Sequence, residues 1–336
     1  NEGDAVAIAS GNQLAGHRGV AMFQNSGLGN AVNPLTSMNH TFRIPVLLIV
    51  TLRGEPGGPA DAPQHGLMGP ITTSMLDTMQ VKWEYFPSEA AEIEPALRRA
   101  VKYMDAESLP FAFVMKKGSV SPYEHRQLLP EVPMPRVKVR SSSVPQPQVR
   151  RTEMLQAVQS HSRASDIVLG TTGYTGRELY ALEHRQNQFY MIGSMGCVSS
   201  LALGLALAKP GLRVIALDGD GSVLMRMGAL ATNGYKRPAN MVHIVLDNSR
   251  HESTGGQATV APAIDLCAVA TACGYEHIHD ISWPTELEKI LDKPLNAGLT
   301  FVRARILPGY PDALPRPKEE PRELANQFSE YLKRRS

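Results

Sequence analysis

The sequence predicts an α/β protein made of two tandem units, each a mostly parallel sheet covered by helices. Short apolar runs alternate with longer helical patterns both before and after a Pro/Ser-rich segment, residues 130–148. Such alternation is typical of parallel sheets covered by helices. The prolines and consecutive serines of the segment do not suit a regular helix or a central strand, so we expect an extended connector. The expected units are therefore residues 1–129 and 149–336.

The first unit contains four apolar runs that we expect to be buried strands. They cover residues 20–23, 46–51, 81–86 and 111–115. Residues 88–104, between the last two runs, are predicted to form a helix with acidic residues in its first turns. The sequence begins at Asn1 without a methionine, and its first residues already have the pattern of a folded domain. We therefore expect an N-terminal piece of this unit to be missing.

The second unit repeats the alternation. Its predicted strands are residues 167–170, 213–217, 241–246, 275–279 and 300–306. Its predicted helices are residues 196–209, 223–233, 266–273, 285–291 and 322–334. In open parallel sheets, ligands bind beyond the carboxyl ends of the strands, so residues that directly follow each strand are the candidates for chemistry.

Composition excludes several classes of protein. The 34 Lys and Arg residues nearly balance the 32 Asp and Glu residues, which leaves no basic excess of the kind that binds nucleic acid. The three cysteines, Cys197, Cys267 and Cys273, include no CxxC pair, which argues against a disulfide framework or a zinc site. The longest strongly apolar stretch, residues 45–52, is too short to cross a bilayer. We expect a cytoplasmic protein with no nucleic-acid or membrane partner.

The strongest chemical signal comes directly after the predicted strand 213–217. It is the run Gly219, Asp220, Gly221 and Ser222. Its glycines allow backbone amides to approach an anion, and a helix that starts near Ser222 would add its N-terminal dipole. One strand–helix–strand unit later, Asp247 and Asn248 follow the next strand, so Asp220 and Asn248 are predicted to lie side by side. Carboxylate and amide oxygens are suitable ligands for Mg²⁺. The alternative interpretation is structural: the Gly-Asp-Gly run would be a tight turn, and Asp247 and Asn248 would cap a helix.

This spacing resembles the diphosphate–Mg²⁺ motif of thiamine-diphosphate (ThDP) enzymes. The resemblance implies that Asp220 and Asn248 bind Mg²⁺ through their side chains and Arg250 through its backbone carbonyl. Gly219, Gly221 and Ser222 are implied to contact the cofactor. The match is imperfect, because Asp247 stands where the motif has its first asparagine.

Two further segments match the same enzymes. Gly193, Ser194 and Met195 precede a helix of small residues. The resemblance implies that the Gly193 carbonyl accepts a hydrogen bond from the cofactor's 4′-amino group and that Met195 wedges between its two rings. Glu2 would open a helix and bond N1′ of the aminopyrimidine, a role that needs a buried carboxylate of raised proton affinity. Taken alone, Met195 is a core residue and Glu2 a helix-start residue.

A closer resemblance covers essentially the whole chain. The runs that carry it are QNSGLGNAVNPLTSM, DAPQHGLMGPIT, TTGYTGRELY, GDGSVLMRMGALATNGY and LDNSRHESTGGQATVAP. They are similar to phosphonopyruvate decarboxylases, with sulfopyruvate decarboxylases as near relatives. The resemblance implies a pyrimidine-binding domain joined directly to a diphosphate-binding domain without a middle domain, and loss of CO₂ from a small anionic 2-oxo acid. It also implies a homodimer or higher homo-oligomer, because the cofactor of this fold lies between two chains.

The anionic tail of such a substrate needs cations or a cluster of N–H donors. Catalytic candidates besides Glu2 are His65 and His251, and the loop after Asn248 offers an anion nest or, alternatively, a flexible lid. Candidate substrate ligands are His17, Arg18, Arg53, Arg250, Ser253 and Thr254.

Three other readings remain open. One is a ThDP-dependent oxidoreductase component, although the scattered cysteines argue against it. Another is a non-catalytic relative that keeps the fold for assembly, and the presence of Glu2, Gly193, Asp220 and Asn248 argues against that. The last is a mutase or acyloin synthase, which shares the first steps of the reaction.

Overall fold

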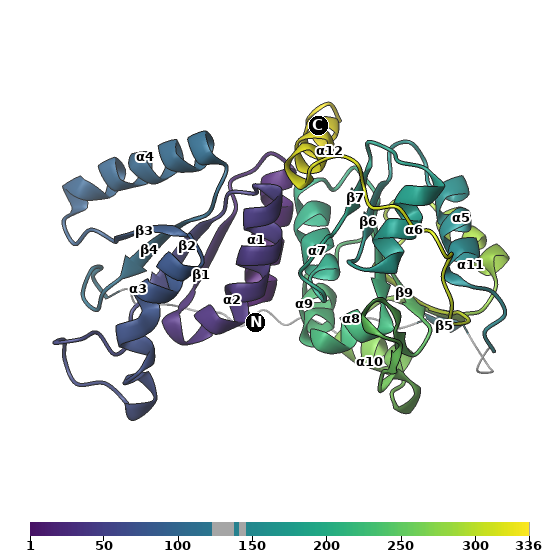
Figure 1. Cartoon of the computed structure of the whole chain (residues 1–336), viewed down its shortest axis with the longest axis horizontal. Helices are drawn as coiled ribbons and strands as arrows, with labels where there is room; N and C mark the ends of the chain where they lie inside the picture. Colours follow the sequence, from purple (N-terminus) through teal and green to yellow (C-terminus); the bar gives the residue numbers. More distant parts are fainter. Residues whose placement is uncertain (123–137, 141–145, 336) are drawn as a thin grey trace.

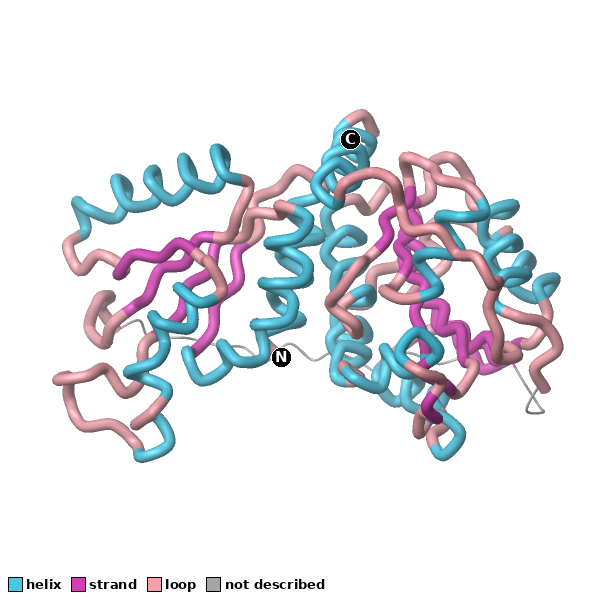
Figure 2. The backbone as a smooth tube through the Cα atoms, in the orientation of Figure 1, coloured by secondary structure: helices cyan, strands magenta, loops and turns pink. Residues whose placement is uncertain are grey.

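The computed structural model describes residues 1–122, 138–140 and 146–335. Two parallel sheets lie on either side of a central pair of helices, α1 (Glu2–Leu14) and α7 (Val198–Ala208), as Figures 1 and 2 show. This α/β arrangement is the predicted fold class. In the described part of the chain, no helix is both long and apolar enough to cross a membrane.

The first sheet has the strand order β1-β2-β4-β3, and all neighbours are parallel. Its strands are β1 (Val20–Gln24), β2 (Leu47–Thr51), β3 (Lys82–Tyr85) and β4 (Phe111–Met115). Apolar residues of α1, α2 (Leu28–Pro34) and α3 (Met68–Thr78) pack on one face, and α4 (Ala90–Glu107) packs on the other. All four predicted strands are confirmed, and the helix predicted over 88–104 is present as α4, which begins two residues later and ends three residues later; α2 and α3 are additional.

The second sheet has seven parallel strands in the order β5-β12-β13-β9-β8-β6-β7. Its strands are β5 (Lys138–Arg140), β6 (Ile167–Gly170), β7 (Gln188–Tyr190), β8 (Val214–Gly219), β9 (Met241–Asp247), β12 (His277–Ile281) and β13 (Thr300–Arg305). Its helices are α5 (Arg151–His161), α6 (Tyr174–Leu182), α7, α8 (Asp220–Met225), α9 (Gly228–Lys236), α10 (Leu266–Cys273), α11 (Pro284–Leu291) and α12 (Pro321–Lys333). One apolar core lies between the sheet and α7, α10 and α12, and another lies between its opposite face and α5, α6 and α11.

Three expectations for the second half need correction. The helix predicted over 223–233 is two helices, α8 and α9, separated at Arg226 and Met227. The strand predicted over 275–279 begins two residues later, at His277. Within the predicted connector, residues 130–137 and 141–145 lie outside the described residues, but Lys138–Arg140 form an edge strand that pairs with β12.

The two sheets are joined by a glycine-mediated crossing of α1 and α7. A Cβ atom on Gly204 would lie 2.1 Å from the Ile8 carbonyl oxygen, and one on Gly11 would lie 2.3 Å from the Leu201 oxygen. Only glycine permits this approach, because real Cβ contacts are never so short. Both helices begin beside Arg226, since Cβ atoms on Gly3 and Gly196 would each meet its side chain. The N-terminal ends of α1 and α7 therefore lie together, at the bottom of Figure 1.

Candidate active site

Asp220 and Asn248 lie at the carboxyl ends of two neighbouring strands. In the β8–β9 pair, Gly219 stands opposite Leu246, so Asp220 and Asn248 leave the sheet next to each other. Adjacent strands are about 4.8 Å apart. Both residues line one narrow cleft, together with Met195, Gly219, Gly221 and Ser222. The structure thus brings together most of the residues that the sequence motif selects in this half.

The Asp220 carboxylate is buried without a cationic partner among the described residues. Its side chain accepts a hydrogen bond of 2.5 Å from the Thr259 hydroxyl. Burial raises the pKa of Asp220 to about 6, although the Thr259 hydrogen bond lowers it; the nearby charge of Asp247 raises it further. A divalent cation placed here would offset this unfavourable burial of charge.

The donors around Asp220 fit Mg²⁺. Among the described residues, no group of three or more His, Cys, Asp or Glu side chains is arranged to hold a metal ion. The Asp220 carboxylate, the Asn248 amide oxygen and a backbone carbonyl are instead the hard oxygen ligands that Mg²⁺ combines with phosphate oxygens. The Asn248 oxygen accepts a hydrogen bond of 3.1 Å from the Arg250 N–H, which holds the amide within this turn.

Asp247, the departure from the family motif, has a partner of its own. One carboxylate oxygen lies 2.6 Å from a guanidinium nitrogen of Arg303 on β13, in a pair whose side chains are both almost fully buried. The other oxygen accepts a hydrogen bond from the Ser249 N–H. Arg303 also donates to the Ile264 and Ala261 carbonyls. The acid at 247 therefore ties the turn after β9 to β13, and its charge is compensated.

The loop after Asn248 is held against the rest of the site. It forms the hairpin β10 (Arg250–His251) and β11 (Gln257–Ala258). The His251 ring lies on Gly221, where a Cβ atom would come within 2.4 Å of it. Buried Arg151 pairs with both Glu178 and Glu252, which fixes the middle of the loop. Arg250, His251 and Ser253 line the cleft; Thr254 is exposed and lies outside the cleft lining.

Ser222 connects the two loops of this half. Its hydroxyl accepts a hydrogen bond of 2.9 Å from the Gly196 N–H and lies 3.2 Å from the Thr171 hydroxyl. The segment before Gly196 faces the first half. Ser194, in the left-handed region at φ 55°, forms a hydroxyl–hydroxyl contact of 2.7 Å with Ser37. Gly193 is needed at its position because a Cβ atom would lie 2.6 Å from the Ser37 side chain.

Glu2 begins α1, as expected, but its proton affinity differs from the expectation. The Asn30 amide donates a hydrogen bond of 2.8 Å to the Oε2 atom of Glu2. This bond lowers the pKa of Glu2 and outweighs its partial burial, which raises it. The expected raised proton affinity is therefore not found in the protein alone. The carboxylate lies directly over Gly27, where any Cβ atom would clash with it.

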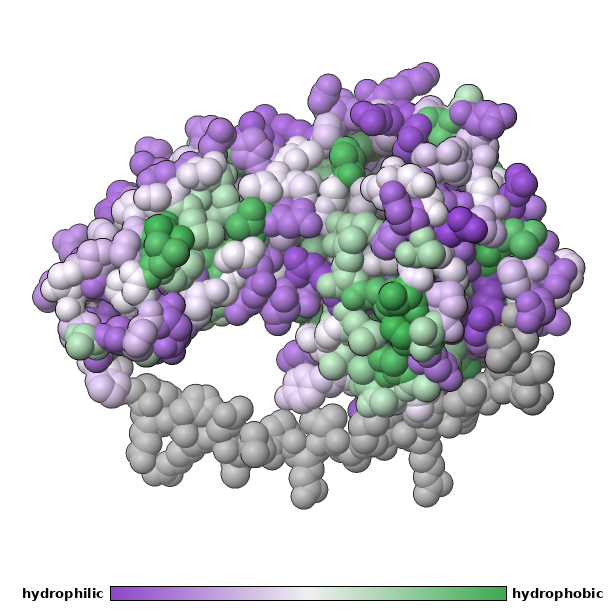
Figure 3. Space-filling view, turned by 60° about the horizontal axis from the view of Figure 1, so that its bottom comes forward, coloured by the Kyte–Doolittle hydropathy of each residue, from purple (hydrophilic) through white to green (hydrophobic). Residues whose placement is uncertain are grey.

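Arg226 lies where the two halves meet. Its guanidinium is 3.2 Å from the Asp4 carboxylate and donates to the Asn30 carbonyl at 3.3 Å. One chain therefore brings the Glu2 end of α1 next to the Gly193 segment. The expectation that each complete site lies between two chains stays a prediction. Figure 3 shows the face at this end, where a hydrophilic strip separates two apolar areas.

His65 and Arg53 meet at the carboxyl edge of the first sheet through Asp61. The His65 Nδ1 atom lies 3.1 Å from an oxygen of Asp61. Arg53 approaches both Asp61 oxygens, and this bidentate pair is the main reason why the pKa of Asp61 lies far below its ordinary value. His65 is buried, whereas the Arg53 side chain is 45% exposed.

His17 and Arg18 are not brought to this edge. They follow the C-terminal end of α1, about 20 Å along the helix from Glu2, and precede β1 at the opposite edge of the sheet. Arg18 forms a surface ion pair with Asp105. The structure therefore does not bring His17 and Arg18 together with Glu2, because the length of α1 separates them.

Sequence reasoning missed several residues that contact the candidate site residues. These are Asn30, Asp61, Thr259 and Arg303. Asp61 had a local signal, since it precedes His65 by one helical turn in the chain. The others are partners from distant segments and carry no local signal.

Comparison with known proteins identifies the family. Residues 170–304 match the family described as "Thiamine pyrophosphate enzyme, C-terminal TPP binding domain". The chain is 42% identical to the phosphonopyruvate decarboxylase of Streptomyces viridochromogenes, over 98% of this chain and 83% of that protein. The chain belongs to the phosphonopyruvate decarboxylase family of ThDP enzymes. It is also 31% identical to the sulfopyruvate decarboxylase of Methanosarcina acetivorans, over 98% of this chain and 86% of that one.

Solved structures agree with the fold. A thiamin diphosphate-dependent enzyme from Mycobacterium smegmatis superimposes with a TM-score of 0.66 at 14% identity, covering 92% of this chain and 91% of that one. The benzoylformate decarboxylase of Polynucleobacter necessarius gives the same TM-score at 13% identity, covering 91% and 90%. At these identities the likeness concerns the fold. The chain therefore carries a ThDP-enzyme fold.

Proposed function

We propose that this chain is a ThDP- and Mg²⁺-dependent decarboxylase that converts phosphonopyruvate to phosphonoacetaldehyde and CO₂. The observation that carries the proposal is the pairing of buried, uncompensated Asp220 with Asn248 at two adjacent strand ends. Family membership adds the cofactor and the reaction class, since the relatives are decarboxylases.

The second half of the chain would hold the cofactor's diphosphate. Asp220, Asn248 and the Arg250 carbonyl are the proposed Mg²⁺ ligands, and Ser222 with the glycines 219 and 221 borders the diphosphate. Gly193 and Met195 lie at the boundary with the first half and are the proposed contacts of the cofactor's rings, with Ser194 tied to Ser37. When bound, ThDP supplies the carbanion that adds to the substrate's ketone and accepts the electron pair left as CO₂ departs.

The chain's own residues position and move protons around that chemistry. Asn30 occupies Oε2 of Glu2, which leaves Oε1 as the oxygen that can accept and return a proton. Asp61 orients His65 through Nδ1, so its other nitrogen is the proposed proton carrier toward the substrate. His251, whose ring lies on Gly221 next to the proposed Mg²⁺ ligand Asp220, is the second proposed proton carrier.

The two sheets correspond, in this proposal, to a pyrimidine-binding domain over 1–129 and a diphosphate-binding domain over 149–336, with no middle domain. Relatives support this division. The Methanocaldococcus jannaschii proteins named "Sulfopyruvate decarboxylase subunit beta" and "subunit alpha" match 55% and 34% of this chain, at 35% identity each. The chain would thus join two subunits in one polypeptide. A homodimer or higher oligomer and a cytoplasmic location remain predictions from the sequence.

Sulfopyruvate is the second candidate substrate, because the M. acetivorans relative aligns over almost the whole chain. The two acids differ in their anionic tails, a phosphonate in one and a sulfonate in the other. The same site therefore serves either substrate, and only the tail's contacts decide between them.

The test is an assay of purified protein with ThDP and Mg²⁺, in which CO₂ and aldehyde are measured with each acid. We expect equal amounts of CO₂ and phosphonoacetaldehyde from phosphonopyruvate, and none after Mg²⁺ is removed with a chelator. Release from sulfopyruvate alone would favour the second candidate. A protein that binds ThDP but releases CO₂ from neither acid would contradict the proposal.

A further inference from the structure

A cavity of about 640 Å³ adjoins the cleft lined by Asp220 and Asn248, which is called the cofactor cleft below. Its walls come from the loop after β6, the first turns of α6, the end of β7 and the segment 306–320 that connects β13 to α12 (the connecting segment). Thr172 and Ser253 line both this cavity and the cleft that contains Asp220. A molecule in the cavity would therefore lie beside the cofactor.

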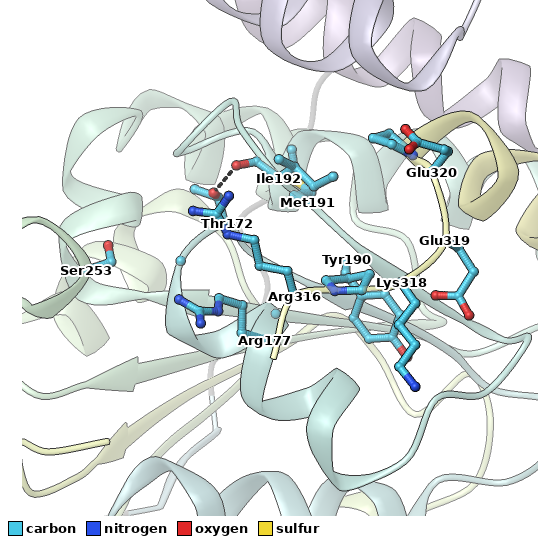
Figure 4. A pocket seen from close by; sticks show the side chains of 14 residues that line it. Thr172, Arg177, Tyr190, Met191, Ile192, Ser253, Arg316, Lys318, Glu319 and Glu320 are labelled. Carbon is cyan, nitrogen blue, oxygen red and sulfur yellow. Dashed lines mark hydrogen bonds between the residues drawn. The ribbon is translucent and has the colours of Figure 1, made fainter. Parts of the chain in front are cut away.

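The end of the cavity nearest the cleft is cationic. Figure 4 shows that the side chains of Arg177 and Arg316 extend toward the side occupied by Thr172 and Ser253, whereas Lys318 and Glu319 point away from it. Arg177 is already engaged, because it donates to the Leu314 and Pro315 carbonyls and so holds the connecting segment in place. Within the described residues, Arg316 makes no hydrogen bond or ion pair, so its guanidinium is available to a ligand.

The other arginines considered as substrate ligands have partners of their own. Arg53 forms a bidentate pair with Asp61, and Arg18 pairs with Asp105. Arg250 donates to the Gly256 carbonyl within its own hairpin. Arg316 differs from all three, since it has no partner among the described residues, lines the cavity that adjoins the cleft, and belongs to a segment held by Arg177.

We infer that Arg316 binds the phosphonate group of the substrate and so determines the enzyme's preference for a 2-oxo acid with an anionic tail. The inference rests on the proposed function and names the tail site within it. A guanidinium matches a phosphonate well, because its planar fork can donate two hydrogen bonds to two oxygens. The tail would lie in the cavity, and the ketone would reach the cleft past Thr172.

The experiment compares Arg316→Met with Lys318→Met, both saturated with ThDP and Mg²⁺. Lys318→Met is a matched control, because it removes one positive charge from the same cavity wall, at a side chain that points away from the cleft. Two quantities are measured: the KM for phosphonopyruvate, and the Kd by calorimetry for phosphonoacetate, which has the tail but no ketone to react. We expect Arg316→Met to raise both roughly ten- to a hundredfold, with kcat and ThDP affinity little changed. Arg316→Lys is expected to recover part of the loss.

Two further arms separate the possible causes. For pyruvate, which lacks the tail, the kcat/KM of Arg316→Met should be close to that of the wild type. The ratio of kcat/KM for phosphonopyruvate to kcat/KM for pyruvate should therefore fall in this variant. Wild-type KM and Kd values in Arg316→Met, or equal losses in Lys318→Met, would overturn the inference. If the wild-type protein releases no CO₂, the proposed function fails by itself. In that case phosphonoacetate binding that depends on Arg316 still supports the tail site, and absence of binding to the wild type refutes it.

Discussion

The carboxylates at the two sheet edges have opposite environments. At the second sheet, Asp220 is buried with a hydroxyl as its hydrogen-bond partner, and burial raises its pKa to about 6. At the first sheet, the Asn30 amide lowers the pKa of Glu2. Arg53 does the same, more strongly, for Asp61. The carboxylates Glu2 and Asp61 of the first edge are satisfied by partners from the chain itself, whereas Asp220 at the second edge has no cationic partner among the described residues.

This difference assigns different tasks to the two edges. A buried carboxylate without a cation destabilises the protein alone, so binding a cation there is favourable. Carboxylates that already have partners are instead held in place, Glu2 by Asn30 and Asp61 by Arg53. In the proposed function, the diphosphate binds at the second half, whereas the proton carriers Glu2, His65 and His251 come from both halves. The two halves meet where Arg226 bridges α1 and the start of α7.

The largest expected effect is that of Asp220→Asn on cofactor binding. Without its charge, the Mg²⁺ site loses its only carboxylate ligand among the proposed donors. We expect the Mg²⁺-dependent affinity for ThDP, measured by calorimetry, to fall at least about a thousandfold, or about 4 kcal/mol. Asp61→Asn removes the same charge at the other edge and should leave this affinity unchanged. Equal losses in both variants would remove the distinction between the edges.

Glu2→Gln tests the opposite half of the comparison. Glutamine keeps the size and the Asn30 contact but cannot accept a proton at the Oε1 position. We expect kcat to fall roughly a hundred- to a thousandfold, with ThDP affinity within a few-fold of the wild type. Glu55→Gln is the control, since Glu55 pairs with Lys116 at the same sheet edge. Unchanged turnover in Glu2→Gln would exclude the residue from catalysis.

Much of the fold could be predicted because parallel strands are local apolar runs. The helices α5 and α6 were missed, since their polar residues obscure a buried face that only packing reveals. The division between α8 and α9 was also missed. Neither of the two residues that separate these helices, Arg226 and Met227, is Gly or Pro. The separation coincides instead with a tertiary contact, in which Arg226 donates hydrogen bonds to Asp4 and Asn30.

The site could be predicted where its geometry follows from strand order. Asp220 and Asn248 each follow a strand, so their adjacency needs only the rule that successive parallel strands pair. The pKa of Glu2 could not be predicted, because its direction depends on Asn30 from another segment. The role of the acid at position 247 could not be predicted either, because its partner Arg303 comes from a third strand. Arg316 lies in a segment without regular structure, which no periodicity indicates.

The smallest effect distinguishes the two edges by the pH dependence of stability without ThDP and Mg²⁺. Because the folded-state pKa of Asp220 is raised to about 6, its contribution is most favourable below pH 4 and is lost as the pH rises through 6, by about 3 kcal/mol. Asp61 has a lowered pKa, so its contribution is present above pH 4 and disappears in acid. We expect Asp220→Asn to melt at a higher temperature than the wild type, by a margin that grows from pH 5 to pH 8. Asp61→Asn should melt lower by a constant margin over that range, since Asp61 is ionised throughout. A margin for Asp220→Asn that does not change with pH would show that this carboxylate is not held at a cost, and that the two edges do not differ in the way proposed.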